Sequence, residues 1–300
     1  MQADIKNIEK MQFLFGQESP FSLSNSKYVI LPIPMEKTTS YMKGTQFGPH
    51  KIVEASTQLE FFDSETKNEP CDAGIFTDWT LGQNPNQFNQ AQSPDIVKSI
   101  NTHVSTLLEQ NKCVISLGGE HTISVGTVPP FVEKYKNDIT LLHIDAHADL
   151  KDTYEGTPLS HACVMKRLLG QLPIVSVGIR SIDREEFNLI QSSDDIHVVF
   201  SEEVHQNPNW IIETLKHIKT KYIYLSFDLD GLDPSVVPGL GTPEPGGLGW
   251  FDALNLIRKA CESHTLVGAD FNEICPSEIP LYSEITACKL IYKTIAYSQL

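Results

Sequence analysis

Two apolar runs in this chain each lead directly into closely spaced acidic side chains. Runs 139–144 and 222–227 are typical of strands buried on both faces of a parallel sheet. The first continues into Asp145-Ala146-His147-Ala148-Asp149 and the second into Asp228-Leu229-Asp230. Alternate residues of an extended segment share a face, so each group would point its ionisable side chains to one side. Carboxylates packed in this way repel one another unless cations lie between them, and the pattern therefore predicts a metal site.

The ligand types restrict the metal and its chemistry. Carboxylates with a minority of imidazoles suit manganese, iron or nickel, and the absence of thiolates argues against a cysteine-type zinc site. Two ions sharing carboxylates would lower the pKa of a water from about 15.7 towards about 7, which favours hydrolysis. The alternative, a turn with solvated acidic residues, is disfavoured because two such clusters both follow strands.

A third strand pattern supplies another candidate ligand. Run 113–117 ends in Gly118-Gly119-Glu120-His121. Paired glycines permit a sharp turn or a close backbone approach. His121 alone could be a capping or surface residue, but beside the two acidic clusters we interpret it as a further metal ligand.

Composition limits the function classes. The chain has 300 residues and 40% hydrophobic residues, enough for a sizeable core, and its net charge is −15. This charge argues against nucleic acid and anionic membranes as partners and favours a small cationic substrate. No apolar run could span a bilayer and the N-terminus lacks a signal-peptide pattern, so we expect a cytoplasmic protein. Six cysteines without CxxC spacing indicate reduced core thiols.

Strand and helix patterns alternate along the chain. Expected strands cover 28–34, 113–117, 139–144, 173–178, 196–200, 222–227 and 265–270. Helical patterns begin at Ser93-Pro94, with Ser93 as N-cap, at Asn207-Pro208, near Phe251 and at Ser283. The fold class predicted is α/β: a single-domain three-layer α/β/α architecture with a mostly parallel sheet. We expect residues 1–27 to be an irregular N-terminal segment and 28–300 to form the domain.

The segment 231–250 is rich in glycine and proline. A loop of this length inside a compact domain is usually functional. Because it directly follows the second acidic cluster, we interpret it as part of the site. Ligand sites in such sheets lie beyond the carboxyl ends of the strands, which is where His121 and both clusters fall.

Together these motifs resemble the ureohydrolase (arginase and agmatinase) family. The similarity rests on Gly118-Gly119-Glu120-His121, on Asp145-Ala-His147-Ala-Asp149 and on Ser226-Phe-Asp228-Leu-Asp230-Gly-Leu-Asp233-Pro234. The loop 241–247 (GTPEPGG) and the early segment 39–49 also resemble family loops. The match runs from about residue 28 to the C-terminus.

The resemblance implies an arginase-like fold and a binuclear centre of two Mn²⁺ ions, with Ni²⁺ or Co²⁺ as alternatives. The implied metal ligands are His121, Asp145, His147, Asp149, Asp228 and Asp230, of which Asp145 and Asp228 bridge. The implied catalytic residues are Asp149, which orients the nucleophilic water, His161, which gives a proton to the leaving amine, and Glu273, which binds the guanidinium. Asp270 is expected to be structural, and Asp233 to organise the loop. Family members commonly form trimers or hexamers, so we expect a homo-oligomer.

The substrate expected from this resemblance is agmatine, hydrolysed to putrescine and urea. The loop after Asp149 is shorter than in arginases, and the acidic Asp152 and Glu155 suit an amine tail, although Lys151 opposes this. The alternatives are another guanidino or formimino hydrolase, namely arginase, guanidinobutyrase, aminopropylagmatine ureohydrolase or formiminoglutamase. A non-catalytic metal-binding scaffold is disfavoured because the ligand set is intact. A zinc deacetylase is disfavoured because six ligands suit two ions rather than one.

Overall fold

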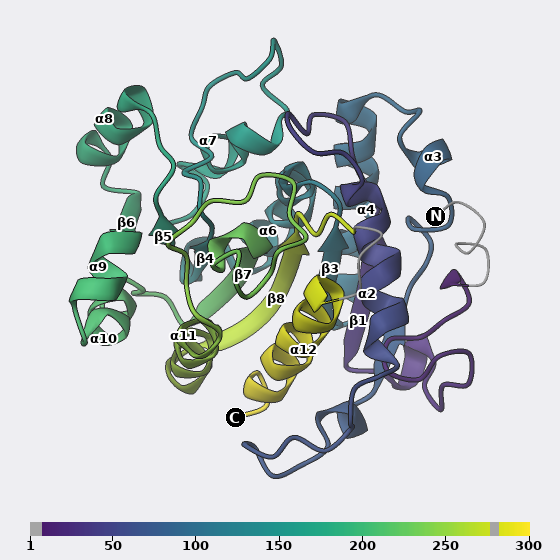
Figure 1. The fold of residues 1–300 in the computed structure, drawn as a ribbon. Coiled ribbons are helices and arrows are strands. Elements are labelled where there is room, and N and C mark those ends of the chain that lie inside the picture. Colours follow the sequence, from purple (N-terminus) through teal and green to yellow (C-terminus); the bar gives the residue numbers. More distant parts are fainter. Residues whose placement is uncertain (1–7, 277–281) are drawn as a thin grey trace.

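Eight strands form one sheet in the computed structural model, which describes residues 8–276 and 282–300 (Figure 1). Their order is β2-β1-β3-β8-β7-β4-β5-β6, and each pairing between them is parallel. The strands are β1 (Tyr28–Ile33), β2 (Ile75–Thr77), β3 (Cys113–Gly118), β4 (Ile139–Ile144), β5 (Ile174–Ile179), β6 (Ile196–Phe200), β7 (Tyr222–Asp228) and β8 (Thr265–Asn272).

The seven strands expected from the sequence are confirmed to within two residues at each end. All residues of β1, β4 and β5 are buried, as continuous apolar runs in a parallel sheet should be. The edge strand β2 was missed because its three residues are too short to show a pattern.

Helices cover both faces of the sheet (Figure 1). One face packs against α2 (Gly48–Ser56), α9 (Ser201–Gln206), α10 (Trp210–Leu215), α11 (Trp250–Ser263) and α12 (Tyr282–Tyr297). The other packs against α4 (Ser93–Glu109), α6 (Pro129–Tyr135), α7 (Val164–Leu168) and α8 (Arg184–Ser192). The described part of the chain also contains the short helices α3 (Pro85–Phe88) and α5 (Ser124–Thr127). Neighbouring residues of β1 alternate between the two cores, with Ile30 in one and Val29 in the other. The three-layer prediction is therefore confirmed.

Two helix starts differ from the sequence prediction. Helix α4 begins at Ser93, but its N-cap is Gln92 and no side chain caps it, so Ser93 is not the cap. Helix α10 begins at Trp210 after Asn209, two residues beyond the Asn207-Pro208 pair. In both cases a proline does lie close to the start of the helix. Proline fixes only its own φ, however, and does not determine which residue is the N-cap.

The described part of the N-terminal segment, residues 8–27, contains one short 3₁₀ helix, Leu23–Asn25. Ile8, Phe13 and Leu14 are buried in the core beneath α2. The Phe13 amide donates a hydrogen bond to Thr77 Oγ1 at 2.8 Å, and the Leu14 amide donates to Ser56 Oγ at 2.9 Å. This segment therefore packs onto the domain; residues 1–7 of the predicted irregular region lie outside the described residues.

The six cysteines are all free thiols, and Cys71, Cys163, Cys275 and Cys288 are buried. Within residues 8–276 and 282–300, no helix combines the length and apolar character that a membrane crossing requires.

A buried histidine in α2 predicts acid sensitivity of the fold. His50 is 0% exposed and lies against the Trp79 ring, with centroids 4.9 Å apart. Burial lowers its pKa from 6.5 to about 4. The unfolded chain therefore binds one more proton than the folded protein between these values, so stability is full above pH 6.5 and falls as pH drops towards 4. The expected loss is about 3 kcal/mol.

We expect His50→Leu to remove this pH dependence, because leucine does not titrate. Free energies of unfolding from urea titrations at pH 7, 5.5 and 4 would measure the difference between the variant and the wild type. All other groups titrate in both proteins and cancel in the comparison. Identical pH slopes for the two proteins would contradict the prediction.

Candidate metal centre and adjoining cavity

Four neighbouring central strands deliver the candidate site residues. Strand order β3-β8-β7-β4 places the carboxyl ends of these strands side by side. His121 follows β3, Glu273 follows β8, Asp228 ends β7 and Asp145 follows β4. Segments far apart in sequence therefore converge at one edge of the sheet, where ligand sites of parallel sheets form.

Three carboxylates converge on the ring of His121. Its Nδ1 atom lies 3.1 Å from Asp145 Oδ2, 3.1 Å from Asp149 Oδ2 and 3.4 Å from Asp228 Oδ2. All four side chains are buried. All four belong to the metal-ligand set that the family resemblance implies.

A second group forms around His147, which is partly exposed. Its Nδ1 atom lies 3.0 Å from Asp230 Oδ2 and 3.6 Å from Asp145 Oδ1. Asp145 therefore presents one oxygen to each group, as expected of a bridging carboxylate. The expected bridge through Asp228 is less evident, because its Oδ1 accepts a hydrogen bond from the Asp230 amide at 2.9 Å.

The charges of the site are unbalanced without a cation. Burial opposes charge on His121, but Asp145, Asp149 and Asp228 overcome this and hold its pKa well above the usual value. Burial and the carboxylates of Asp230 and Asp145 together raise the pKa of Asp228 well above its usual range. The carboxylates of Asp145, Asp149, Asp228 and Asp230 thus share three imidazoles, those of His121, His143 and His147, in a largely buried space. Such crowding is costly unless further positive charge is present.

The donor set fits a pair of divalent ions. His121 Nδ1 is buried and makes no hydrogen bond among the described residues, although three carboxylate oxygens face it. A buried nitrogen without a hydrogen bond, surrounded by carboxylates, is the arrangement expected of a metal ligand. Mixed nitrogen and oxygen donors without a thiolate suit manganese, cobalt or nickel.

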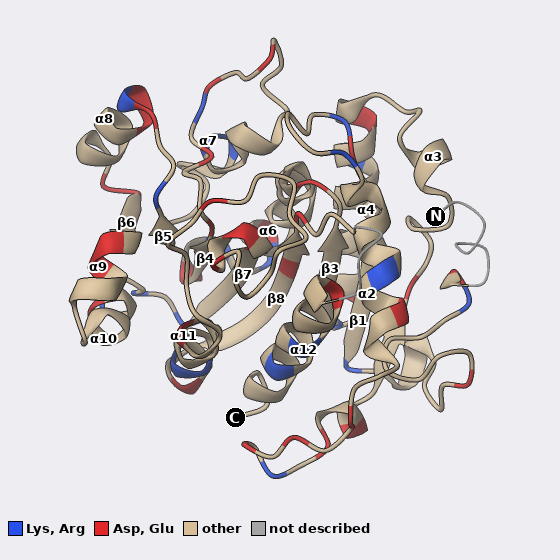
Figure 2. Cartoon of the chain, in the orientation of Figure 1, with Lys and Arg blue, Asp and Glu red and all other residues tan. Residues whose placement is uncertain are grey.

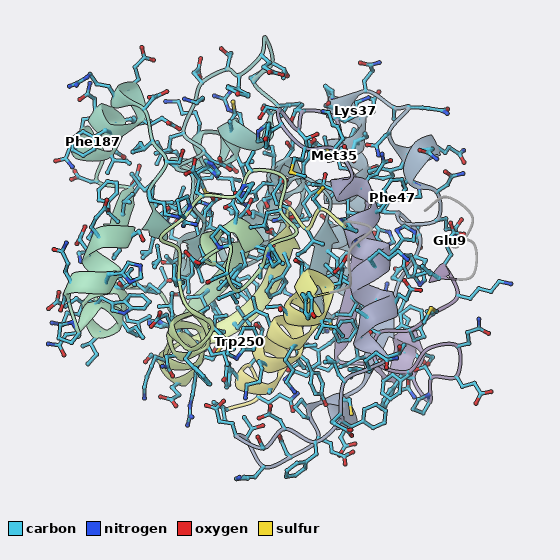
Figure 3. All side chains as sticks on the ribbon, viewed as in Figure 1. Glu9, Met35, Lys37, Phe47, Phe187 and Trp250 are labelled. Atoms are coloured by element: carbon cyan, nitrogen blue, oxygen red, sulfur yellow. The ribbon has the colours of Figure 1, made fainter. Side chains whose placement is uncertain are left out.

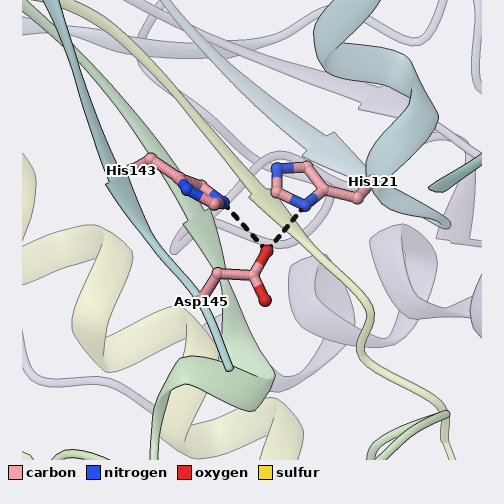
Figure 4. Close-up of side chains that lie close together, drawn as sticks. All are labelled: His121, His143 and Asp145. Carbon is pink, nitrogen blue, oxygen red and sulfur yellow. Dashed lines mark hydrogen bonds and ion pairs between the residues drawn. The ribbon is translucent and has the colours of Figure 1, made fainter. Parts of the chain in front are cut away.

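His143 is a site residue that the sequence interpretation missed. Its Nε2 atom lies 2.9 Å from Asp145 Oδ2, the same oxygen that His121 approaches (Figure 4). Its Nδ1 atom lies 2.9 Å from Ser176 Oγ. The available signal was its position two residues before Asp145, on the same face of β4. His143 holds Asp145 in place from within the sheet.

The far side of His121 is held by a buried polar network. His121 Nε2 lies 2.9 Å from Ser226 Oγ, which donates to Asp270 Oδ1 at 2.8 Å. Asp270 also accepts hydrogen bonds from Thr127, Tyr224 and Asn272. Asp270 therefore supports the His121 ring through Ser226, which agrees with the structural role expected for it.

Two site residues have unusual backbone conformations. Asp149 has φ of +53° and Glu273 has φ of +69°, a region that non-glycine residues rarely occupy.

Glu273 is buried, and its Oε1 accepts a hydrogen bond from the His121 amide at 2.7 Å. Burial and the nearby Glu120 and Asp230 raise the pKa of Glu273 well above its usual range. Such a site favours a cationic ligand, which would offset the buried negative charge.

His161 lies at the mouth of the cavity, held by the loop that follows β1. Thr38 Oγ1 lies 3.2 Å from His161 Nδ1, and Ser40 Oγ lies 3.4 Å from Nε2. The buried carboxylate of Glu120 accepts hydrogen bonds from the amides of Lys37 and Thr38, both at 2.6 Å (Lys37 is labelled in Figure 3). Glu120 thus positions this loop, a role that the sequence interpretation did not assign.

A cavity of about 650 Å³ adjoins the two groups of candidate metal ligands. Its lining includes His147, Asp149 and His161. Asp152 and Glu155, which the sequence suggested for an amine tail, are not among the lining residues; Asp152 instead pairs with Arg167 at 2.7 Å. The acidic residues that line it, apart from Asp149, are Asp183, Glu186 and Glu244.

The long loop after β7 is fastened at both ends by Asp233. Its carboxylate accepts hydrogen bonds from Ser235, Gly246 and Gly247, which lower its pKa to about 2. This agrees with the organising role expected for Asp233. In Figure 2, acidic segments (red) lie on the loops at the centre of the view, where the central strands end.

Fold and site together define an α/β protein with a candidate binuclear metal centre at the carboxyl ends of its parallel strands. A sequence model described as "Arginase family" matches residues 26–296. The chain belongs to the arginase family, whose members use a binuclear metal centre. It is accordingly a ureohydrolase-type amidinohydrolase.

Individual proteins similar to this chain carry names that agree with this family. The chain is 39% identical over 288 residues to the N(1)-aminopropylagmatine ureohydrolase of Synechocystis sp., covering 95% of this chain and 93% of that relative. It is 35% identical over 266 residues to the agmatinase of Bacillus cereus, covering 85% and 86%. The crystal structure of agmatine ureohydrolase of Thermoplasma volcanium superposes with a TM-score of 0.82 at 30% identity, covering 96% of this chain and 94% of that one.

Proposed function

We propose that this protein hydrolyses the guanidino group of a linear, amine-tailed guanidine to urea and an amine. The observation that carries this proposal is the position of the buried ligand cluster beside a cavity with acidic walls. A cation with one planar end and an ammonium at the other would match both parts of the site.

The residues that would hold two divalent ions, which we propose to be Mn²⁺, are His121, Asp145, His147, Asp149, Asp228 and Asp230. Such ions would supply a water molecule with a pKa lowered towards about 7, and thus a nucleophile at neutral pH. The hydrogen bond between His143 and Asp145 and the one that Ser226 Oγ accepts from His121 Nε2 fix the orientation of these two ligand residues.

The remaining steps belong to side chains of this chain. Glu273 receives the guanidinium, because a carboxylate can accept hydrogen bonds from two of its nitrogens. Asp149, which lines the cavity, orients the attacking water. His161 gives a proton to the departing amine nitrogen, and its contacts with Thr38 and Ser40 fix the ring for this transfer.

Two substrates fit this scheme. The similarity to the Synechocystis enzyme supports N(1)-aminopropylagmatine, and a cavity of about 650 Å³ has room for its longer tail. The similarity to the Bacillus cereus enzyme supports agmatine, the substrate expected from the sequence. We place N(1)-aminopropylagmatine first.

Urea release from a panel of guanidino compounds tests this proposal. With manganese-loaded protein, we expect kcat/KM to be highest for N(1)-aminopropylagmatine and about 10- to 200-fold lower for agmatine, since loss of a small contact region costs about 1–3 kcal/mol. Arginine and 4-guanidinobutyrate should react at least about 100-fold more slowly, because their carboxylates would face acidic walls.

Dialysis against a chelator should abolish the activity, and readdition of manganese should restore it. A preference for arginine would contradict the choice of substrate. Absence of urea from every compound, with metal still bound, would instead favour the non-catalytic scaffold.

A further inference from the structure

The cavity wall contains four carboxylates, on Asp149, Asp183, Glu186 and Glu244. A bound ammonium group requires a carboxylate whose charge and lone pairs are not already satisfied by protein donors. Asp149 belongs to the ligand group around His121. The other three carboxylates belong to neither ligand group, and they differ in the hydrogen bonds that they accept.

Asp183 and Glu186 already have donors. Lys151 pairs with Asp183, and its Nζ atom lies 3.5 Å from Glu186 Oε2. Asp183 also caps α8 by accepting hydrogen bonds from the Glu185 and Glu186 amides. Glu186 accepts hydrogen bonds from the Leu150 amide at 2.9 Å and the Asp183 amide at 3.0 Å. This pair of acids thus fastens α8 to the loop after β4 and has its own cation in Lys151.

Glu244 differs from both. It is half-buried, and within the described part of the chain no group donates a hydrogen bond to its carboxylate. The nearby cation, Arg180, directs its donors to backbone oxygens instead. These are the carbonyl groups of Gly178, Asp230, Gly231, Leu232, Glu244 and Pro245. Arg180 therefore fixes the backbone of Glu244 and attracts its carboxylate electrostatically without donating a hydrogen bond to it, which leaves the carboxylate oxygens available to a ligand.

The loop that carries Glu244 starts at the guanidinium-binding end of the site. A Cβ atom placed on Gly241 would lie 3.6 Å from Glu273 Oε2, so this backbone borders that carboxylate. Thr242 Oγ1 donates to Asp230 Oδ2 at 3.2 Å. Glu244 follows three residues after Gly241, a span of at most about 11 Å.

This upper bound on the span lies within the reach of the substrate. Six single bonds of about 1.5 Å join the guanidino carbon of agmatine to its ammonium nitrogen, which gives about 7 Å when extended. A hydrogen bond of about 2.9 Å at each end extends the reach to on the order of 13 Å. Glu273 is not itself among the lining residues of the cavity, but Gly241 borders it and the next residues, Thr242 to Glu244, line the cavity. A molecule held at Glu273 and lying along this loop therefore brings its ammonium group towards Glu244.

We propose that Glu244 is a specificity-determining residue that receives the ammonium group lying four methylenes from the guanidino group of the substrate. This inference rests on the proposed ureohydrolase function and names the residue that selects the amine tail. The same nitrogen is a primary ammonium in agmatine and a secondary ammonium in N(1)-aminopropylagmatine, so both substrates should depend on Glu244.

Glu244→Gln tests the proposal, with agmatine compared against butylguanidine, which has the same length but no ammonium. We expect KM for agmatine to rise about 10- to 100-fold, since a hydrogen bond to a charged group contributes about 1.5–3 kcal/mol. Turnover at saturation should change less than about threefold, and kcat/KM for butylguanidine should stay within the same limit. Putrescine binding by titration calorimetry gives a second readout and should weaken about tenfold or more.

Glu185→Gln is the matched control, because Glu185 is an exposed acid beside Glu186 that does not line the cavity. It should leave all values unchanged. Equal losses on agmatine and butylguanidine in Glu244→Gln would indicate general loop damage and overturn the proposal, as would unchanged agmatine KM and putrescine affinity. If the wild type released no urea from any guanidine, the proposed function would fail, and putrescine binding alone would still decide the role of Glu244.

Discussion

Asp230→Ala is expected to lower the metal content from two ions to one per chain and to reduce kcat/KM at least about 1000-fold. Asp230 Oδ2 lies 3.0 Å from His147 Nδ1, so this carboxylate completes the smaller of the two ligand groups. The larger group around His121 does not include Asp230 and should keep its ion. Metal analysis of the purified variant, together with urea release, measures both effects.

The control for this variant is Asp194→Ala, which removes an exposed carboxylate on the turn before β6. It should retain two ions and full activity. Two tightly bound ions in Asp230→Ala would show that this residue is not a ligand. Loss of both ions with intact folding would show that the two groups bind metal as one unit.

The sheet could be predicted because its strands are long, apolar and buried on both faces. Strands β4 and β6 begin and end at the expected residues. The three-residue strand β2 could not be predicted, because it carries no periodic signal and is defined only by pairing with β1. Helix α10 was placed too early because the Asn207-Pro208 pair does not determine where the helix begins, which is at Trp210.

The candidate ligands could be predicted because each acidic cluster directly follows a buried strand, which places it at the carboxyl edge of the sheet. The extended geometry expected for both clusters continues only in part, because Asp230 lies in the 3₁₀ helix Leu229–Gly231 and Asp149 has φ of +53°. His143 and Glu120 were missed for different reasons. His143 lies inside an apolar run and resembled a core residue, whereas Glu120 acts on a loop 82 residues away in sequence. Such a long-range partner has no local signal.

Substrate selection was the least predictable part, because side-chain pairing decides which charges are available. From the sequence, Asp152 and Glu155 were the acids closest to the site motif. In the structure Asp152 pairs with Arg167, and neither residue lines the cavity. The positive charge of Lys151 was expected to disfavour an amine tail, but in the structure Lys151 pairs with Asp183 and Glu186. The available acid, Glu244, lies about 90 positions further along the chain.

Glu273→Gln is expected to reduce kcat/KM for the amine-tailed substrate by about 100- to 1000-fold while leaving both metal ions bound. Glutamine has nearly the same shape, and its carbonyl oxygen can still accept the hydrogen bond from the His121 amide. Its charge is lost, so the guanidinium no longer meets a carboxylate. Metal analysis and urea release again provide the measurements.

The stability of this variant separates a local effect from misfolding. Glu273 is buried, its φ of +69° is unusual, and its pKa is raised well above the ordinary value by burial and by Glu120. An amide at this position removes the cost of a buried carboxylate, so Tm should stay equal or rise. Low activity with two ions bound and an unchanged or higher Tm would assign Glu273 to substrate binding. Full activity would exclude it from the mechanism, and a lower Tm with lost metal would assign it to the support of His121 instead.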